Sequence, residues 1–415
     1  MKLRMIPGGV TAASGFRASS CAAGIKYRDR QDMAMIVSSV PCVAAGTFTS
    51  NRVKAAPVLW DMDIIHTHPV ARAVVVNAGI ANAATGEAGH SQCRETAAYV
   101  EQALNIPASQ VLIGSTGVIG PVLPMERIRA GISCMAGTLA DTAEAGFAAA
   151  KAIMTTDTVS KECAVSFDLP AADGQGSVTV RLGGMSKGSG MIHPNMCTML
   201  AYLTTDCAIS QELLQRAVSE VVPDTFNMIS VDGDTSTNDT LLALASGLAG
   251  NRPVQEADES YALFREALFT VCRDLAVKMA GDGEGATHLI EVQVQNADTL
   301  ENARVLARSV VSSSLVKAMI FGRDANCGRI LCALGYAGPD FDLNRLQVWL
   351  GEAPNRVCFC QDGCVLTFDE EKALQLLSNR KVTIVCDMGM GEARATAWGC
   401  DLTYDYVKIN GDYRT

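Results

Sequence analysis

The densest group of residues that could carry chemistry is KGSGMIHPNMCTML, which runs from Lys187 to Leu200. A glycine-rich stretch with a lysine suggests phosphate binding, but that motif requires a serine or threonine directly after the lysine. Gly188 occupies this position, so the phosphate-loop interpretation fails.

The stretch from Gly184 to Gly188 matches G-x-S-x-G, which would make Ser186 a candidate nucleophile. A serine of this kind works with an acidic residue and then a histidine further along the chain. Only His193 and His288 follow, and His193 is too close in sequence to be delivered by a separate loop. This scarcity of histidines disfavours a Ser-His-acid hydrolase.

Thr198 is the third candidate, because a threonine can act as a nucleophile when its own free α-amine serves as the base. The unperturbed pKa of an α-amine is about 7.7–8.0, so much of it is neutral at cellular pH. To free that amine, the hydroxyl of Thr198 would first attack the carbonyl of Cys197, in a segment whose flanking proline and glycines favour a strained turn. Most threonines beside a turn are structural, so residue chemistry alone leaves this interpretation open.

Metal sites are not predicted. Structural zinc prefers paired C-x-x-C ligands, whereas Cys358 and Cys360 alternate along an expected strand, with Cys364 beyond it. The acidic stretch DGDTSTND lacks the glycine placement and closing glutamate of an EF-hand loop. The 15 cysteines of this long chain, which shows no secretory signal, are expected to be reduced and mostly buried thiols.

The elements that must position these residues are predicted from apolar periodicity and from turn residues. Predicted strands are 73–77, 178–182, 287–295, 381–387 and 394–402, and predicted helices are 137–154, 211–221 with Ser210 as its N-cap, 259–280 and 301–321. The pattern changes character beyond residue 285, which predicts a domain boundary there.

Composition excludes several classes of function. The formal charge is −10 and no Lys/Arg-rich run is present, so neither nucleic acid nor an anionic membrane is an expected partner. No segment reaches the roughly 18 uninterrupted apolar residues of a transmembrane helix. Pro7 and the two glycines after it would break a transit-peptide helix, so we expect a cytoplasmic protein with small-molecule partners.

The segment KGSGMIHPNMCTML closely resembles the self-cleavage segment of the ornithine acetyltransferase family, whose members are also called bifunctional glutamate N-acetyltransferases. Further blocks resemble this family in the expected order. They are GGVTAASGFRASSCAAGIK from Gly8, STGVIG from Ser115, MTTDT from Met154, DGDTSTND from Asp232, DGEGAT from Asp282, LVKAMIFGRDANCGRI from Leu315 and WGCDLTYDYVKINGDYRT from Trp398. The resemblance covers essentially the whole chain, which is therefore identified as a member.

The resemblance implies a role for each matching residue. Thr198 aligns with the nucleophile, and Thr116 and Gly117 align with the oxyanion hole, which needs hydrogen-bond donors where negative charge develops. The matches to substrate contacts are Thr155, Lys187, Thr198, Glu284, Asn410 and the terminal Thr415. A lysine suits an α-carboxylate and a glutamate suits an ammonium group. No role is implied for Lys317, Asn326 or Arg329.

The resemblance also implies the fold and the assembly. The expected fold is α/β, with two stacked β-sheets flanked by helix layers as in N-terminal nucleophile hydrolases but connected differently, plus a smaller C-terminal α/β domain. The predicted domains are residues 1–285 and 286–415, with the C-terminal tail returning to the active site. Cleavage between Cys197 and Thr198 would yield chains 1–197 and 198–415, two of each forming a heterotetramer.

The implied reaction is ping-pong acetyl transfer on Thr198 from N2-acetylornithine to glutamate, without a metal or organic cofactor. Acetyl-CoA stays open as a second donor, because bifunctional and ornithine-only members share these motifs. Two alternatives also stay open: an amidase or aminopeptidase of related fold that uses water as acceptor, and an uncleaved amino-acid-binding pseudoenzyme.

The sequence departs from the family pattern at two positions. Cys197 replaces the usual alanine before the scissile bond, which bears on the cleavage rate, and Cys327 replaces the usual tryptophan, which bears on local packing.

Overall fold

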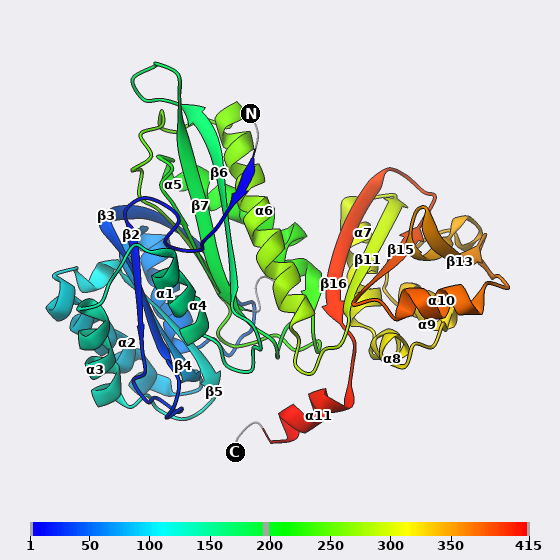
Figure 1. Cartoon of the computed structure of the whole chain (residues 1–415), viewed down its shortest axis with the longest axis horizontal. Coiled ribbons are helices and arrows are strands. Elements are labelled where there is room, and N and C mark those ends of the chain that lie inside the picture. The colour runs from blue at the N-terminus through cyan, green and yellow to red at the C-terminus, as the bar shows by residue number, and fades with distance from the viewer. Residues whose placement is uncertain (1–2, 194–198, 413–415) are drawn as a thin grey trace. The chain divides into compact units, whose positions relative to one another are not determined.

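The computed structural model describes residues 3–193 and 199–412, which divide into two compact units (Figure 1). Within the described residues, the first unit comprises 3–188, 199–223 and 235–275, and the second comprises 189–193, 224–234 and 276–412. The sequence-based division at residue 285 stays a prediction about domains. Each unit is built on its own β-sheet, which confirms the α/β class with two sheets and helices.

The first unit contains a mixed sheet of nine described strands, in the order β1-β6-β7-β8-β10-β3-β4-β5 with β2 paired to β3. The strands are β1 (Arg4–Ile6), β2 (Phe16–Cys21), β3 (Met33–Phe48), β4 (Val70–Ile80), β5 (Val111–Val118), β6 (Lys161–Pro170), β7 (Ser177–Lys187), β8 (Leu200–Thr205) and β10 (Thr240–Ala245). The helices are α1 (Ala56–Thr67), α2 (Gly86–Leu104), α3 (Met125–Ala136), α4 (Ala143–Ala152), α5 (Gln211–Val221) and α6 (Glu259–Gly281), of which residues 276–281 belong to the second unit.

The long strand β3 organises this sheet, because its first part pairs with β2 and β4 and its second part pairs with β10. Its side chains alternate between two apolar clusters, with Ile36 in one and Met35 in the other. Helix α4 adds Ala149 to the first cluster, and helices α2 and α3 add Val100 and Ile132 to the second. Both faces of the sheet are therefore buried around β3, which explains the near-continuous apolar runs of its central strands.

The second unit contains a sheet of seven described strands in the order β14-β13-β12-β15-β11-β16-β9. The strands are β9 (Ile229–Ser230), β11 (Leu289–Ala297), β12 (Gln347–Glu352), β13 (Asn355–Gln361), β14 (Cys364–Val365), β15 (Lys381–Asp387) and β16 (Ala393–Cys400). The helices are α7 (Leu300–Ser312), α8 (Ser314–Gly322), α9 (Cys327–Gly335), α10 (Glu370–Leu377) and α11 (Tyr404–Gly411). Short 3-10 turns lie at Ala108–Gln110, Val222–Asp224, Phe226–Met228 and Leu343–Arg345. Helix α7 packs on β11 and β16 and supports the centre of this sheet.

Two predicted helices have the wrong bounds. The helix predicted over 137–154 begins only at Ala143, because Ala140 pairs with Ala18 in an isolated bridge and Thr142 caps α4 by accepting from the Ala145 N–H. The helix predicted over 301–321 is two helices, α7 and α8, bent by 54° where Ser313 caps the second one. The strand predicted over 178–182 is also longer than expected, since β7 continues through Gly183 and Gly184 to Lys187. The other predicted elements are confirmed to within three residues at their ends.

In the described part of the chain, the length and apolar character needed to cross a membrane are found in no single helix. They are reached only by α7 and α8 taken together as a bent pair.

Candidate active site

Three of the predicted site residues, Cys197, Thr198 and Thr415, lie outside the described residues. The described chain resumes at Met199, whose carbonyl accepts a hydrogen bond from the Thr240 N–H at 2.8 Å. Leu200 then begins β8, which runs parallel to β10. The residue that follows Thr198 is thus fixed at the start of a central strand of the first unit.

Thr116 and Gly117 lie at the end of β5, where this strand runs parallel to β4 and Gly117 pairs with Gly79. Gly117 has φ +132°, and a Cβ at this position would lie 2.2 Å from the carbonyl carbon of Gly79. Only glycine fits so close an approach of two backbones. The Asn238 side chain fixes the same loops by donating to the carbonyls of Ala81 and Ser115, at 2.6 and 2.8 Å. This strand end is therefore held tightly, as the donors of a preorganised oxyanion hole would need to be.

Asp157 is fully buried at the centre of a second cluster in the first unit. Its Oδ1 accepts from Lys161 Nζ and from the Gly188 N–H, both at 2.7 Å. Its Oδ2 lies 3.9 Å from Lys187 Nζ and accepts from the Thr155 N–H at 3.1 Å. Burial alone would raise the pKa of Asp157, but the charges of Lys187 and Lys161 and the hydrogen bonds it accepts lower it to about 2. The side chain therefore stays ionised and brings two predicted substrate contacts, Thr155 and Lys187, to one carboxylate.

The segment that carries Thr155 is also held from its carbonyl side. Arg30 donates to the carbonyls of Met154 and Thr155. The guanidinium of Arg30 in turn lies over the ring of Tyr27, with 4.3 Å from its central carbon to the ring centroid. The Thr155 N–H bound by Asp157 and the two carbonyls bound by Arg30 fix this loop from both sides.

Asp239, the last residue of the DGDTSTND block, is a second buried carboxyl in the first unit, and no role was predicted for it. Its Oδ2 has no hydrogen-bond partner among the residues that the structure describes. Burial raises the pKa of Asp239 well above its usual range, although Ser236, Thr49, Lys187 and the Met199 N–H act in the opposite direction. A buried carboxyl with a raised pKa therefore lies near Lys187 and near the residue after Thr198.

Glu284 and Asn410, the described substrate contacts predicted in the second unit, touch each other. Asn410 Nδ2 donates to Glu284 Oε2 at 2.6 Å, and the Glu284 N–H donates to the Ser189 carbonyl at 2.8 Å. A Cβ at Gly190 would lie 2.4 Å from Cδ of Glu284, so a glycine there makes room for this carboxyl group. The two residues come from segments far apart in sequence, as the resemblance implies.

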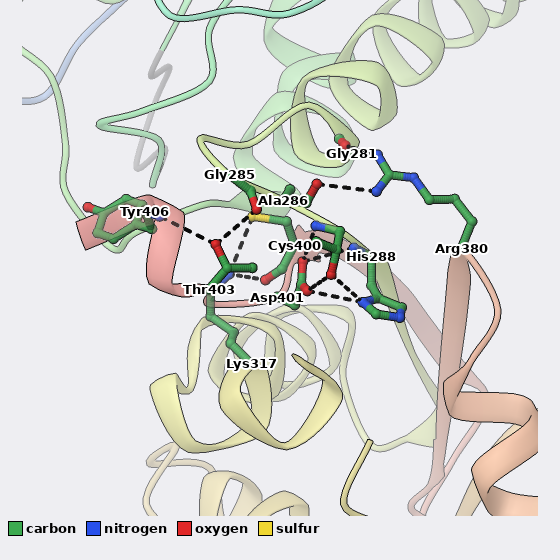
Figure 2. A network of polar contacts seen from close by, with 11 residues as sticks. Gly281, Gly285, Ala286, His288, Lys317, Arg380, Cys400, Asp401, Thr403 and Tyr406 are labelled. Atoms are coloured by element: carbon green, nitrogen blue, oxygen red, sulfur yellow. Dashed lines mark hydrogen bonds and ion pairs between the residues drawn. The ribbon is translucent and has the colours of Figure 1, made fainter. Parts of the chain in front are cut away.

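Figure 2 shows how the loop that carries Glu284 is anchored. Asp401 accepts the backbone N–H groups of Thr287 and His288, both at 2.8 Å, as well as hydrogen bonds from both side chains. Thr403 donates to the Gly285 carbonyl at 2.9 Å and also caps α11, the helix of Asn410. One end of the sheet thus fixes both the Glu284 loop and the Asn410 helix.

Lys317 appears in the same view, almost completely buried, and donates to the carbonyl of Cys400 at the end of β16. This contact assigns a structural role to a lysine for which the sequence implied none.

Within residues 3–193 and 199–412, no three His, Cys, Asp or Glu side chains gather as they would around a metal ion. The absence of a cofactor stays a prediction.

A family model described as "ArgJ family" matches residues 17–415. The chain belongs to the ArgJ family. It is therefore an acyltransferase of arginine biosynthesis, and the resemblance stated from its motifs is confirmed.

Curated ArgJ relatives match over the full length of this chain. The arginine biosynthesis bifunctional protein ArgJ of Symbiobacterium thermophilum is 48% identical over 415 residues, covering 100% of both chains. That of Caldanaerobacter subterraneus subsp. tengcongensis is 46% identical over 413 residues, again covering 100% of both.

Two solved structures are also similar. An ArgJ structure from Bacillus halodurans is 43% identical, covers 51% of this chain and 97% of its own, and has a TM-score of 0.48. An ornithine acetyltransferase from Mycobacterium tuberculosis, complexed with ornithine, is 40% identical, covers 47% of this chain and 100% of its own, and has a TM-score of 0.42.

Asp157 should make the free energy of unfolding of this ArgJ-family chain depend on pH. Because its folded pKa of about 2 lies below its usual 3.8, the carboxylate stabilises the fold above about pH 4, and this contribution is lost as the pH falls toward 2. The shift corresponds to about 2 kcal/mol. We expect Asp157→Asn to lower the free energy of unfolding at pH 7 and the deficit to shrink at pH 3. Urea unfolding at both pH values measures this, and a deficit independent of pH would contradict it.

Proposed function

We propose that this ArgJ-family chain is a glutamate N-acetyltransferase, which moves acetyl from N2-acetylornithine to glutamate on Thr198 after cutting itself between Cys197 and Thr198. The observation that carries the proposal is the full-length similarity to bifunctional ArgJ proteins. Two features of the first unit support it: the close approach of Gly117 to Gly79 suits a preorganised oxyanion hole, and Asp157 brings Thr155 and Lys187 together.

In the first half-reaction, the Thr198 hydroxyl attacks the acetyl carbonyl and its proton passes to the α-amine of the same residue. Thr116 and Gly117 donate hydrogen bonds to the oxyanion of the tetrahedral intermediate. The bond between the acetyl carbon and the ornithine nitrogen then breaks, the nitrogen takes the proton from the α-amine, and ornithine leaves. In the second half, the neutral amine of glutamate attacks the acetyl ester, its proton returns to Thr198, and N-acetylglutamate forms.

The other residues implied by the resemblance complete the proposal. Lys187 and Thr155 bind the substrate carboxylate, and Glu284 receives an ammonium group with Asn410 and Thr415 as further substrate contacts. The mature protein is a heterotetramer of two chains 1–197 and two chains 198–415. No cofactor takes part, and acetyl-CoA is a candidate second donor.

One assay separates this proposal from its alternatives. Purified protein is incubated with N2-acetylornithine, with and without glutamate, and products and intact masses are measured. Equimolar ornithine and N-acetylglutamate, formed by protein that has two fragments meeting between Cys197 and Thr198, are the expected result. Ornithine and acetate formed without glutamate would replace the proposal with an amidase. A single uncut chain without turnover would replace it with an amino-acid-binding protein.

Gly190→Ala tests the Glu284 contact. The new Cβ would overlap the flexible end of the Glu284 side chain and not the backbone, so the carboxyl group must move away from Asn410 at little cost in stability. We expect KM for N2-acetylornithine to rise roughly tenfold with a nearly unchanged melting temperature. The control is Gly411→Ala, where a Cβ has open space. Equal KM values for the two variants would show that Glu284 does not contact the substrate.

A further inference from the structure

Strand β5, which carries the proposed oxyanion donors, lies at one end of its sheet. Among the described strands only β4 pairs with it, so one edge of β5 presents its N–H and C=O groups to no other strand. Helix α1 packs against β5 and supplies side chains to this edge. Trp60 Nε1 donates to the Val111 carbonyl at 2.9 Å, and Asp61 Oδ1 accepts from the Ile113 N–H at 2.8 Å. Two consecutive residues of one helix thus take the place of a neighbouring strand.

These side-chain bonds follow the edge of β5 toward its catalytic end. Asn238 donates to the Ser115 carbonyl at 2.8 Å, so side chains bind every second residue from Val111 to Ser115. Alternate residues of a strand in a parallel ladder direct their backbone groups to the same side. Gly117 is therefore the next residue on this side of β5, and its N–H is one that the proposed oxyanion hole requires.

The second oxygen of Asp61 and the hydroxyl of Tyr202 form another pair of interest. Both side chains are 0% exposed, and within the described part of the chain neither Asp61 Oδ2 nor the Tyr202 hydroxyl has a hydrogen-bond partner. The hydroxyl lies over β5, because a Cβ at Gly114 would overlap it, one residue beyond the Ile113 amide that Asp61 binds. Burial and the charge of Asp61 raise the pKa of Tyr202 well above its usual range, so the two groups are close enough to interact. Because unpaired buried polar groups are costly, each is a suitable partner for the other.

Tyr202 belongs to β8, the strand that begins two residues after Thr198. Strands β8 and β5 are not neighbours in the sheet. Their side chains meet in one apolar cluster, which contains Tyr202 and Leu200 from β8 and Leu112 from β5. The Tyr202 hydroxyl thus reaches from the strand of the proposed nucleophile to the strand of the proposed oxyanion donors.

We propose that Asp61 is a positioning residue for acetyl transfer. Its carboxyl fixes the free edge of β5 at Ile113 and pairs with the Tyr202 hydroxyl, which sets β5 against β8. The oxyanion donors are thereby held in place relative to the strand that follows Thr198. This inference rests on the proposed function, because it assumes the nucleophile and the oxyanion hole named there. Asp61 does not touch the substrate, since its side chain is completely buried.

The test is kinetic, with N2-acetylornithine as substrate and ornithine release measured on the cleaved fraction of the full-length protein. Asp61→Leu removes both the acceptor for the Ile113 N–H and the partner of Tyr202. We expect kcat to fall roughly 10- to 100-fold, because displacing a catalytic group by about 1 Å has an effect of that size. KM should stay near the wild-type value, since the proposed substrate contacts at Lys187 and Glu284 are untouched. Asp61→Asn keeps an oxygen for the amide and a polar group for the hydroxyl, so it should retain most of the kcat.

Asp206→Leu is the matched control. Asp206 is also completely buried in the first unit and accepts the N–H groups of Ser14 and Arg181 at 2.9 and 2.7 Å, but it follows the far end of β8. This variant should lose at least as much melting temperature as Asp61→Leu and keep the wild-type kcat. Equal losses of kcat in the two variants would reduce Asp61 to a structural residue and overturn the inference.

Tyr202→Phe decides the matter if either leucine variant fails to fold, because it removes a single oxygen atom. Its kcat should fall severalfold at an unchanged KM. The effects of Tyr202→Phe and Asp61→Leu should not add in the double variant, since both break the same link. A folded Tyr202→Phe protein with the wild-type kcat would contradict the inference.

The contact of Tyr202 with β5 is tested without turnover. Gly114→Ala places a Cβ on the Tyr202 hydroxyl and should lower the melting temperature. Combining it with Tyr202→Phe removes that overlap and leaves Cζ of residue 202 and Val76 Cγ1 as the nearest atoms, at 3.1 and 3.2 Å, so most of the loss should be recovered. A double variant no more stable than Gly114→Ala alone would show that Tyr202 does not reach β5, and the inference would fail.

The proposed reaction and the inference can fail separately. If ornithine is released with acetate and without N-acetylglutamate, the proposed transfer fails, but the inference stands when kcat for ornithine release follows the expected order of variants. If the wild-type protein transfers acetyl and a folded Asp61→Leu variant keeps its kcat, the transfer stands and the inference fails. A wild-type protein inert toward N2-acetylornithine would overturn both.

Discussion

Replacing Thr198 with alanine is expected to leave one uncut chain of 415 residues that transfers no acetyl. The substitution removes the hydroxyl needed for self-cleavage and, because no cut occurs, the α-amine needed as base. Loss of a covalent nucleophile lowers kcat by roughly 10⁴-fold or more in enzymes of this kind. Intact mass spectrometry follows the cut, and formation of N-acetylglutamate follows the reaction.

Two companion variants make this result specific. Thr198→Ser keeps a hydroxyl and an α-amine, so it should be cut and should retain measurable transfer. Cys197→Ala should also be cut, because it alters only the side chain before the scissile bond. A Thr198→Ala protein that is still cleaved at this bond, or still acetylates glutamate, would show that another residue is the nucleophile.

Local signals located many of the helices and strands. Helix α5 begins where Ser210 was predicted to cap it, and Ser210 accepts from the Leu213 N–H. Strand β15 has the predicted bounds, Lys381–Asp387. Both cases depend on residues next to one another in sequence. The Ala-rich stretch 137–154 failed because Ala140 pairs with Ala18, a partner that no local pattern reveals.

The candidate site was predictable in its residue types but not in its organisation. Motif resemblance pointed to Thr155 and Lys187, yet the carboxylate that joins them, Asp157, looked like one more polar residue in MTTDT. Lys161 opens a strand and would ordinarily be exposed. Its complete burial depends on Asp157 and on packing against β7, which are tertiary facts.

Gly117→Ala is expected to have the second largest effect. A Cβ would lie 2.2 Å from the carbonyl carbon and 2.4 Å from the oxygen of Gly79, and 2.6 Å from the nitrogen of Ile80. These are backbone atoms of the adjacent strand, so β4 and β5 must separate and the donors at Thr116 and Gly117 must move. Loss of one oxyanion-hole donor lowers kcat by roughly 10²- to 10³-fold, and we expect a fall of that size.

The matched control is Gly120→Ala, two residues beyond the end of β5. Gly120 also has a positive φ, +106°, but a Cβ there meets no atom within 4 Å. Both variants carry the backbone strain of a side chain at positive φ, about 1–2 kcal/mol, and only Gly117→Ala adds the clash. Turnover is compared on the cleaved fraction of each protein, so that slower maturation does not count as slower transfer. If both variants lose stability to the same degree and both keep kcat, the tight approach of Gly117 to Gly79 serves the fold alone, and the oxyanion donors must be sought elsewhere. If only Gly117→Ala loses kcat, the contact between these two glycines is what holds the donors in place.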